Sequence, residues 1–579
     1  MMNKNTIIAI VLSTIVVLAS LILQPMLFPN TANNVAESEN VTEETSAVKV
    51  EEDKKDLSLI VEDESDKNVE EQFFEITTKN AQIVLTNRGG DMISYKLLNH
   101  IDVDTKDGIQ MVDNVSKTNR ACAVAFGDVN SPINNEIFNV THKDENVYFF
   151  TKAISIKKED GSVSKVILGK RYTFDPESYV FKLDILIHGD DIENLVYTLR
   201  TSPQIGPHFD PKLNRYENRQ FISFNGEKAK RQVISAKQFK SYNKDYLWNG
   251  IGGKYFVNLV VPLNPEKMDN SYYSTLINEE NNYSNAQAIC VRKPFSEDVE
   301  DSYYMYYGPR EEKALKIFNV AENNSWKLSG LKLNECLNSN GWLGWLETIL
   351  KWFMEVINKF VHNWGVSIII MTILIKLLMF PFTKKQSLGT LKMQEIQPKI
   401  QAIQAKYKDN QQKLQQEMAK IYKDNGYNPM SGCLPMLVQF LILFAMYNLF
   451  NNYFEFRGSS FIPNWIEDLS SGDSIYTLKF DIPFFGNQVR ILPFIYLASQ
   501  LLFGKITGNG GTAAPGTSQA QMQMMMYVMP IMFFVMFYNA PSGLLLYWTV
   551  SNIFQMGQQI IINKTMKQKK AELAAKKNK

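Results

Sequence analysis

The chain has 579 residues, which is too long for one ordinary domain, and its 61 basic and 60 acidic side chains give a net charge of +1. This balance argues against a general affinity for nucleic acid. Four cysteines without a CxxC pair, five histidines without HExxH and the lack of a GxxxxGK[ST] loop exclude a disulfide scaffold, a zinc site of the usual kind and the common ATPase phosphate loop, so we expect neither a metal nor a cofactor.

Residues 1–29 are predicted to form an N-terminal signal-anchor helix. Ile7–Leu23 is an uncharged apolar run after Lys4, and Gln24–Phe28 lengthens it without an A-x-A-like cleavage site. We therefore predict an uncleaved transmembrane helix with a cytoplasmic N-terminus, and a cleaved signal peptide is the alternative.

Residues 30–72 are predicted to be a disordered acidic linker. Between residues 30 and 71 the chain holds 14 acidic residues against four lysines, and it has no aromatic side chain. Such a segment buries too little apolar surface to offset the entropy of ordering.

Residues 73–329 are predicted to form a large all-β sandwich outside the cytoplasm. Segments such as Gln82–Thr86, Val147–Phe150 and Tyr179–Ile185 are rich in β-branched and aromatic residues, and turn signals such as Arg88-Gly89-Gly90 separate them. We expect a scaffold or binding surface. A catalytic site is the alternative, although no carboxylate pair or histidine cluster identifies one.

Residues 341–360 are predicted to form an amphipathic helix on the outer membrane surface. Tryptophan, leucine, isoleucine and phenylalanine recur there at helical spacing, while Glu347, Lys351, Glu355 and Lys359 recur every four residues. Tryptophan also favours the headgroup layer of a bilayer. A helix that packs on the β-domain is the alternative.

Residues 361–562 are predicted to form a core of five membrane spans. The first, Trp364–Phe382, has 19 residues, close to the length needed to cross a bilayer, and is expected to end at Pro381–Lys385. The other four apolar segments are Leu434–Leu449, Ile491–Phe503, Met522–Phe537 and Leu544–Ile562.

Charge in the connections predicts the orientation of this core. Residues 383–430 hold nine lysines against four acidic residues and are predicted to form a cytoplasmic helical hairpin from Lys392–Tyr407 and Gln411–Lys423. Residues 453–487 carry five acidic residues against one arginine and one lysine, as expected for an external loop. The tail 563–579 has seven lysines and one glutamate and is predicted to be cytoplasmic.

Lys376 is the only charged residue in the apolar interior of these spans. A lysine there costs about 2.5–3.5 kcal/mol on insertion scales, so we expect polar neighbours. Candidates are Thr372, one turn earlier, Gln439 in the second core span, and the helically spaced Tyr547, Ser551, Gln555 and Gln558 in the last, with Asn552 and Gln559 beside them. We predict a hydrophilic groove, and the alternatives are a lysine that snorkels to the headgroups and amides that only join helices.

Five stretches within residues 341–562 resemble the YidC/Oxa/Alb family of membrane protein insertases. They read N-W-G-V-S-I-I-I-M-T-I-L-I-K, M-F-P-F-T-K-K-Q, I-Q-P-K-I-Q, N-P-M-S-G-C-L-P-M-L-V-Q and P-S-G-L-L-L-Y-W-T-V-S-N. The R-G-G-D stretch at Arg88–Asp91 and the large external domain resemble the Gram-negative form of the family, in which that domain is a periplasmic β-supersandwich.

The resemblance implies a groove that is open to the cytoplasm and to lipid and closed to the outside. One basic residue in it, here Lys376, receives the polar segment of a client. Many members have arginine at this position, so the bidentate fork of arginine is missing here. Family groove positions also match Thr372, Gln439 and Trp548, and the last is often tyrosine in relatives.

The function that the resemblance implies is insertion and folding of inner-membrane proteins, alone or with the Sec translocon, without enzymatic activity. Expected partners are nascent membrane proteins, the lipid bilayer, the Sec translocon, and the ribosome and signal recognition particle system at the hairpin and basic tail. No direct sequence-specific binding of nucleic acid is expected.

Two other function classes remain open from the residues alone. A channel or transporter for a small anion would also use a buried cation, although an ion-coupled transporter would normally carry an acidic relay in its spans. A carbohydrate-active enzyme within residues 73–329 is the other candidate.

Overall fold

The computed structural model describes residues 59–60, 70–102, 105–157, 161–190, 192–209, 216–234, 239–242, 246–274, 286–338, 343–407, 410–426, 430–483, 485–508 and 527–577. The chain divides into two compact units, Met1–Ser339 and Asn340–Lys579, which are described separately. The predicted signal anchor and most of the acidic linker lie outside the described residues.

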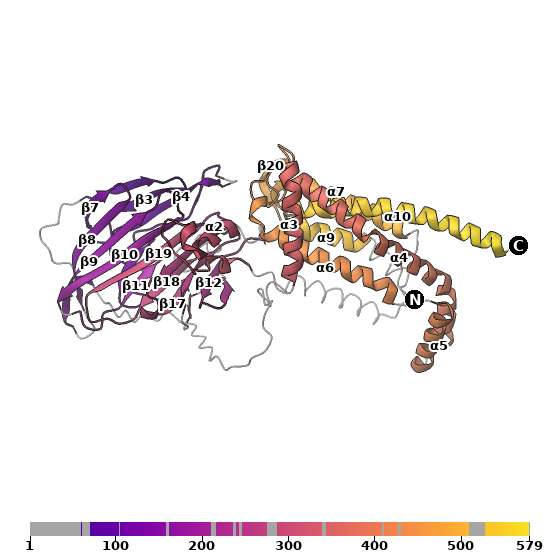
Figure 1. Cartoon of the computed structure of the whole chain (residues 1–579), viewed down its shortest axis with the longest axis horizontal. Coiled ribbons are helices and arrows are strands. Elements are labelled where there is room, and N and C mark those ends of the chain that lie inside the picture. Colours follow the sequence, from indigo (N-terminus) through magenta and orange to yellow (C-terminus); the bar gives the residue numbers. More distant parts are fainter. Residues whose placement is uncertain are drawn as a thin grey trace. The chain divides into compact units, whose positions relative to one another are not determined.

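The first unit is built on antiparallel sheets (Figure 1). The largest has the order β1-β8-β9-β10-β19-β16-β15-β12-β13, with β7 paired to β8. Its strands are β1 Leu59–Ile60, β7 Asn139–Asp144, β8 Val147–Lys157, β9 Val163–Phe174, β10 Val180–Asp190, β12 Gln220–Phe224, β13 Ala229–Val233, β15 Trp248–Gly252, β16 Phe256–Pro262 and β19 Val299–Pro309.

Two smaller sheets complete this unit. One has the order β14-β17-β18-β11-β6, and the other runs β2-β3-β4-β5. Their strands are β14 Phe239–Tyr242, β17 Met268–Ser274, β18 Gln287–Arg292, β11 Tyr197–Arg200, β6 Ala123–Phe126, β2 Phe73–Thr77, β3 Ala81–Thr86, β4 Asp91–Ile101 and β5 Gly108–Gln110. Polar contacts join the sheets face to face: the Tyr197 hydroxyl on β11 donates to Asp301 on β19 over 2.8 Å. The first unit is thus a β-sandwich, as predicted.

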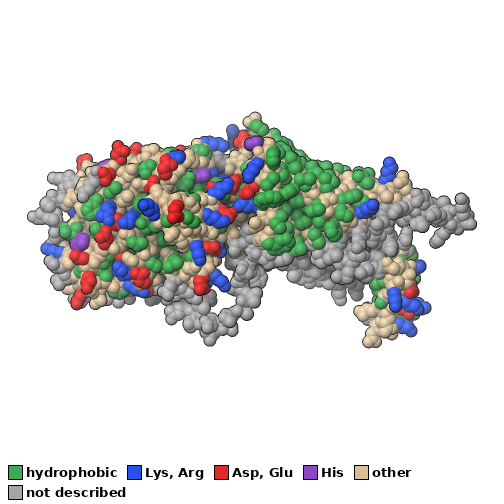
Figure 2. Space-filling view, in the orientation of Figure 1, with side chains coloured by type: hydrophobic (Ala, Val, Ile, Leu, Met, Phe, Trp, Pro, Cys, Tyr) green, Lys and Arg blue, Asp and Glu red, His purple; other side chains and the backbone are tan. Residues whose placement is uncertain are grey.

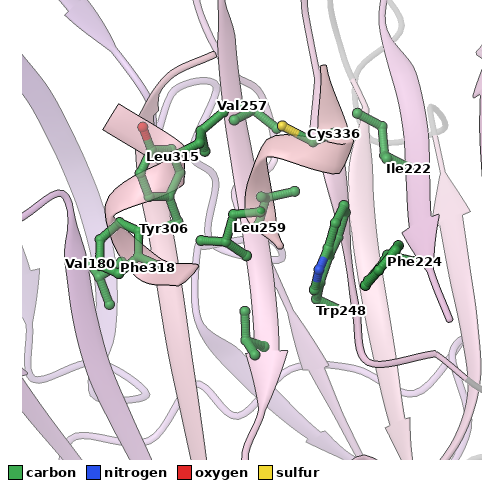
Figure 3. Close-up of a cluster of buried hydrophobic side chains, with 12 residues drawn as sticks. Val180, Ile222, Phe224, Trp248, Val257, Leu259, Tyr306, Leu315, Phe318 and Cys336 are labelled. Carbon is green, nitrogen blue, oxygen red and sulfur yellow. The ribbon is translucent and has the colours of Figure 1, made fainter. Parts of the chain in front are cut away.

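Short helices complete the core on one face of the largest sheet. Helix α2 (Glu312–Lys316) and the 3₁₀ turns Ile317–Asn319, Ala321–Asn323 and Leu333–Cys336 follow β19. Figure 3 shows side chains from these turns and from the strands packed in one cluster. Leu333 and Cys336 are fully buried there, so the unit extends to Ser339, beyond the predicted boundary at residue 329.

A buried ionic cluster fixes the turn between β3 and β4. Gly89 and Gly90 have φ of +67° and +59°, and a Cβ on Gly90 would lie 2.8 Å from the Phe150 Cβ, so glycine is required there. Asp91 follows. Its carboxylate accepts hydrogen bonds from Arg120 Nε over 2.8 Å and from Lys170 Nζ. The three ionic side chains are at most 3% exposed.

The second unit is helical. Its helices are α3 Gly344–Val361, α4 Trp364–Lys406, α5 Gln411–Asp424, α6 Met430–Asn452, α7 Leu492–Gly508, α9 Met529–Phe537 and α10 Ser542–Lys577, with 3₁₀ turn Phe454–Phe456 and strands β20 Tyr476–Ile482 and β21 Gly486–Val489 between α6 and α7. Among the described residues, Trp364–Lys384 is the one stretch both long and apolar enough to cross a membrane, and Leu492–Ile506 is a shorter apolar helix.

The surface of the helical unit is strongly apolar. Figure 2 shows hydrophobic side chains gathered over one face of it. Large apolar side chains exposed on its helices include Leu374, Leu377, Leu378, Phe382, Phe444, Phe494, Ile495, Leu502, Ile531, Val535, Ile553, Ile560 and Ile561. An apolar surface of this extent needs a non-aqueous environment.

Helix α4 differs from the prediction in one respect. The first span was expected to end at Pro381–Lys385, with a separate helix from Lys392, but α4 continues through Pro381 and Pro398 to Lys406. Each proline removes one backbone hydrogen bond without necessarily ending the helix. Ile396 and Ile400 near its end then pack against Met418, Ile421 and Tyr422 of α5.

Helix α3 turns its apolar side outwards. Trp345 and Trp352 are more than 60% exposed, whereas Glu347 is 3% exposed and accepts a hydrogen bond from Asn448 Nδ2 of α6 over 3.1 Å. The sequence pattern pairs Glu347 with Lys351, but an exposed pair of this kind contributes only about 0.2–0.5 kcal/mol, too little to set the helix orientation. Outward tryptophans suit a helix that lies on a lipid surface.

We expect Glu347→Gln to stabilise the helical unit at about pH 8 and to have little effect near pH 4. Burial raises the pKa of the Glu347 carboxyl from 4.5 to about 7, and the Asn448 hydrogen bond opposes this rise. The folded state therefore binds the proton more tightly than the unfolded state, and stability falls as the pH rises from 4.5 to about 7 and then levels off. Glutamine avoids this loss, which is at most about 3 kcal/mol.

Thermal unfolding of the full chain in detergent, followed by the helical circular dichroism signal, measures this difference. Glu355→Gln is the control, since Glu355 is only half-buried and accepts a hydrogen bond from the Tyr453 hydroxyl over 2.8 Å. The expected burial of the ionised carboxylate would be contradicted if Glu347→Gln were no more stable than wild type at pH 8 than it is at pH 4.

Candidate functional site

Lys376 is a residue of α4, and its side chain contacts α10. Its side chain is 4% exposed, and its Nζ donates a hydrogen bond to Oε1 of Gln555 on α10 over 3.2 Å. A lysine that snorkels to the headgroups would carry an exposed amine. The observed amine is instead held inside the helical unit by a predicted partner.

A second glutamine of α10 binds the main chain of the same residue. Gln558 Nε2 donates to the Lys376 carbonyl oxygen over 3.0 Å, and Gln558 is 5% exposed. Gln555 and Gln558 lie one turn apart, so α10 holds both the side chain and the backbone of position 376.

The two helices run in the same direction. Gly543, at the start of α10, lies against the Ile368 side chain near the start of α4. Further along both helices, Lys376 contacts Gln555. Ser551 precedes Gln555 by one turn and Thr372 precedes Lys376 by one turn, so both lie on the side of this contact where the helices begin.

Three other predicted site residues are buried in this arrangement. Thr372 is fully buried and its hydroxyl donates to the Ile368 carbonyl over 2.6 Å within α4. Tyr547 and Ser551 are 1% and 6% exposed, and the Tyr547 ring lies 5.8 Å from that of Phe450. The side chain of Gln439 lies outside the described residues.

Trp548 lies on another side of α10. Its ring centroid is 4.6 Å from that of Phe537 on α9 and 5.7 Å from that of Tyr496 on α7. Its indole Nε1 is buried and has no hydrogen-bond acceptor among the described residues. The structure therefore groups Lys376 with Gln555, and places Trp548 with the aromatic side chains of α7 and α9.

Ser499 of α7 is a polar partner that the sequence pattern did not identify. Asn552 Nδ2 donates to Ser499 Oγ over 3.1 Å, and Ser499 is 4% exposed. The only signal in the sequence is a single serine within the apolar run Ile491–Phe503. Asn552 and Gln558 thus bind neighbouring helices, as the interhelical alternative predicts, while Gln555 binds the charged amine.

The Lys376 amine can exchange one partner for another. A lysine ammonium has three donors and no acceptor. Its hydrogen bond to a neutral amide is weaker than one to a carboxylate, because the carboxylate adds the attraction between opposite charges. An acidic or polar group that reaches this position can therefore displace Gln555.

Two family models match most of the chain. Residues 74–355 match the YidC periplasmic domain, and residues 356–570 match the 60Kd inner membrane protein. The first match covers the β-sandwich and most of α3. The second covers α4 and the helices after it.

Several curated and solved proteins are similar to this chain. The membrane protein insertase YidC of Treponema denticola is 42% identical over 98% of this chain and all of that protein. The YidC of Treponema pallidum is 35% identical, again over 98% of this chain and all of that protein. A crystal structure of an active YidC insertase with its first transmembrane domain resolved is 19% identical, with a TM-score of 0.34, and the match covers 86% of this chain and 93% of that one.

These relatives are named for insertion of membrane proteins and not for a catalysed reaction. Their similarity extends over both units of the chain, from the β-rich domain to the helices that carry Lys376 and Gln555. The chain therefore belongs to the YidC family of membrane protein insertases, with a large β-rich periplasmic domain and a helical core in the inner membrane.

Proposed function

We propose that Lys376 is the docking point for the polar segment of a nascent membrane protein. The observation that supports this most directly is the hydrogen bond between its buried amine and the neutral Gln555 amide. That contact keeps the ammonium inside the helical unit without neutralising its charge. An acidic group on a client would bind the amine more strongly than the amide does.

Client entry requires α4 and α10 to separate at this contact. Both are apolar on their outer sides, where Leu377 and Ile553 are each more than half exposed. A client that slides between them meets lipid on one side and polar side chains on the other. Transfer of its apolar segment into lipid then drives insertion, so the mechanism needs no nucleotide.

Around this site we propose a hydrophilic groove in a core of five spans, carried by α4, α6, α7, α9 and α10. Groove positions include Thr372, Gln439, Tyr547, Trp548, Ser551 and Gln555. A signal anchor at residues 1–29 and the basic tail 563–579 would place both termini in the cytoplasm.

The same proposal extends to partners. The protein would act as insertase and chaperone, alone or with the Sec translocon. The hairpin 383–430 and the basic tail would contact the ribosome and the signal recognition particle system, because their lysine excess suits acidic partners.

Site-specific crosslinking tests the proposed path. A photo-reactive amino acid at Gln555, which is half-buried and contacts Lys376 from α10, should capture the polar segment of a stalled client chain. Leu502 on α7 is the matched control, because it is 54% exposed on an apolar helix and lies outside the proposed path. Equal capture at Gln555 and Leu502, or capture only at Leu502, would place the client path elsewhere.

A further inference from the structure

The connection between α6 and α7 contains an amphipathic β-hairpin. Along the sequence of β20 the apolar residues Tyr476, Leu478, Phe480 and Ile482 alternate with the polar residues Thr477, Lys479 and Asp481, and the pairing with β21 is irregular between Thr477 and Ile482. Val489 of β21 lies opposite Tyr476 and extends the apolar face. Phe480 is 65% exposed, Tyr476 61% and Ile482 40%.

A two-stranded hairpin with such a face gains little stability in water. Isolated hairpins are marginal at best unless one face packs against another surface. Here Tyr476, Phe480 and Ile482 remain exposed, and no other part of the described chain covers them. The row of aromatic and aliphatic side chains therefore suggests an apolar surface outside the protein.

Polar contacts at its base hold the hairpin at the start of α7. The Asp473 carboxylate is buried, and its Oδ2 accepts hydrogen bonds from the backbone N–H groups of Ile491 and Leu492 over 2.8 and 2.9 Å. Arg490 Nη1 donates to the Asp473 carbonyl over 2.8 Å, and its Nε donates to Asn539 Oδ1 over 3.0 Å. The hairpin therefore stays at the level where α7 begins.

This level is on the periplasmic side. The periplasmic-domain match ends at residue 355, just before α4 begins. The ring of Trp364 at the start of α4 lies 5.5 Å from that of Tyr453 and 5.8 Å from that of Phe456, both after the end of α6. Figure 1 shows β20 at the same end of the helical unit as α3, whose tryptophans face outwards.

The hairpin is also continuous with the lipid-facing helices. The Phe485 ring at its turn lies 4.7 Å from the ring of Tyr538 and 6.2 Å from that of Phe534. Phe534 in turn lies 4.8 Å from Phe494, which is 53% exposed on α7. An unbroken series of aromatic contacts thus joins the hairpin to the outer surface of a predicted span.

We propose that the β20–β21 hairpin is a membrane-surface anchor that rests on the periplasmic leaflet. Tyr476, Phe480 and Ile482 lie among the headgroups and upper acyl chains, where aromatic side chains are favoured. The exposed Lys479 and Asp481 side chains remain in water. Together with α3, the hairpin fixes the depth of the helical unit on its outer side, a role separate from client binding at Lys376.

Depth-dependent quenching tests this placement in the full-length protein. A fluorescent coumarin amino acid is placed at the apolar positions Phe480 or Ile482, and at the polar positions Lys479 or Asp481 as matched controls. The protein is reconstituted in vesicles of phosphatidylethanolamine and phosphatidylglycerol with brominated acyl chains. We expect loss of fluorescence at Phe480 and Ile482 with bromolipid, and loss at Lys479 and Asp481 with aqueous acrylamide.

Two results would overturn the proposal. One is equal quenching at the apolar and the polar positions by either reagent. The other is a photo-crosslinker at Phe480 that captures a client polypeptide or a second copy of this chain, because the apolar face would then bind protein instead of lipid. Adducts with phospholipid at Phe480 would support the proposal independently of fluorescence.

Discussion

We expect Lys376→Glu to reduce the insertion of a short client with an acidic external tail by about tenfold or more. This reduction corresponds to a free-energy change of at least about 1.4 kcal/mol. Glutamate reverses the charge that the client meets, and like charges repel where attraction is needed. It should still fold, because the Gln555 amide can donate its N–H to glutamate where its oxygen accepted from lysine. Protease protection of the client in vesicles that contain wild-type or variant protein measures the effect.

Matched variants separate charge from structure. Lys376→Arg retains the cation and should insert the acidic client nearly as well as wild type. Insertion of a client whose tail carries lysines in place of the acidic residues should fall less with Lys376→Glu, or should increase. If that variant inserted both clients as well as wild type does, the charge at position 376 would have no part in client docking.

Asp91→Ala should destabilise the periplasmic domain by about 3–5 kcal/mol, because it leaves two buried cations without their carboxylate. Lys170 and Arg120 are 0% and 3% exposed, and both bind Asp91. Burial lowers the pKa of Lys170, and the Asp91 carboxylate opposes that decrease. The urea concentration at which the domain in the full-length chain becomes protease-sensitive measures the loss.

Two variants act as controls for this cluster. Glu177→Ala removes the carboxylate of an ion pair with Lys79 in which both side chains are about two-thirds exposed, so it should change little. Asp91→Asn keeps the shape of the side chain and should still destabilise strongly, because the charge is lost. A midpoint for Asp91→Ala close to that of Glu177→Ala would show that the cluster is not needed for stability.

Local pattern predicted the class of each unit well. Alternation in the strands and apolar helical runs are local properties, and Val147–Phe150 or Trp364–Phe382 show them directly. Packing over longer distances was harder to anticipate. The burial of Leu333 and Cys336 depends on strands far away in sequence, and the continuity of α4 through Pro381 depends on neighbours that tolerate a missing hydrogen bond.

The candidate site could be predicted in composition and only partly in geometry. Because a charge inside a membrane span is costly, the sequence identified Lys376 as a candidate. Helical spacing placed Gln555 on one face of the last helix. Which amide binds the amine depends on the tilt and rotation of α10 against α4, which spacing does not give. The β20–β21 hairpin has a visible alternation in the sequence, although residues 453–487 were predicted only as an external loop.

The single helix α4 also has a mechanical consequence. Its 43 residues reach about 64 Å, from Trp364 to the arm that packs on α5. A tilt of that arm would move the part of α4 that carries Lys376, unless the helix bends at Pro381, where a kink is favoured. If clients enter between α4 and α10 as proposed, a load on the arm that packs on α5 would act on that contact through one continuous backbone.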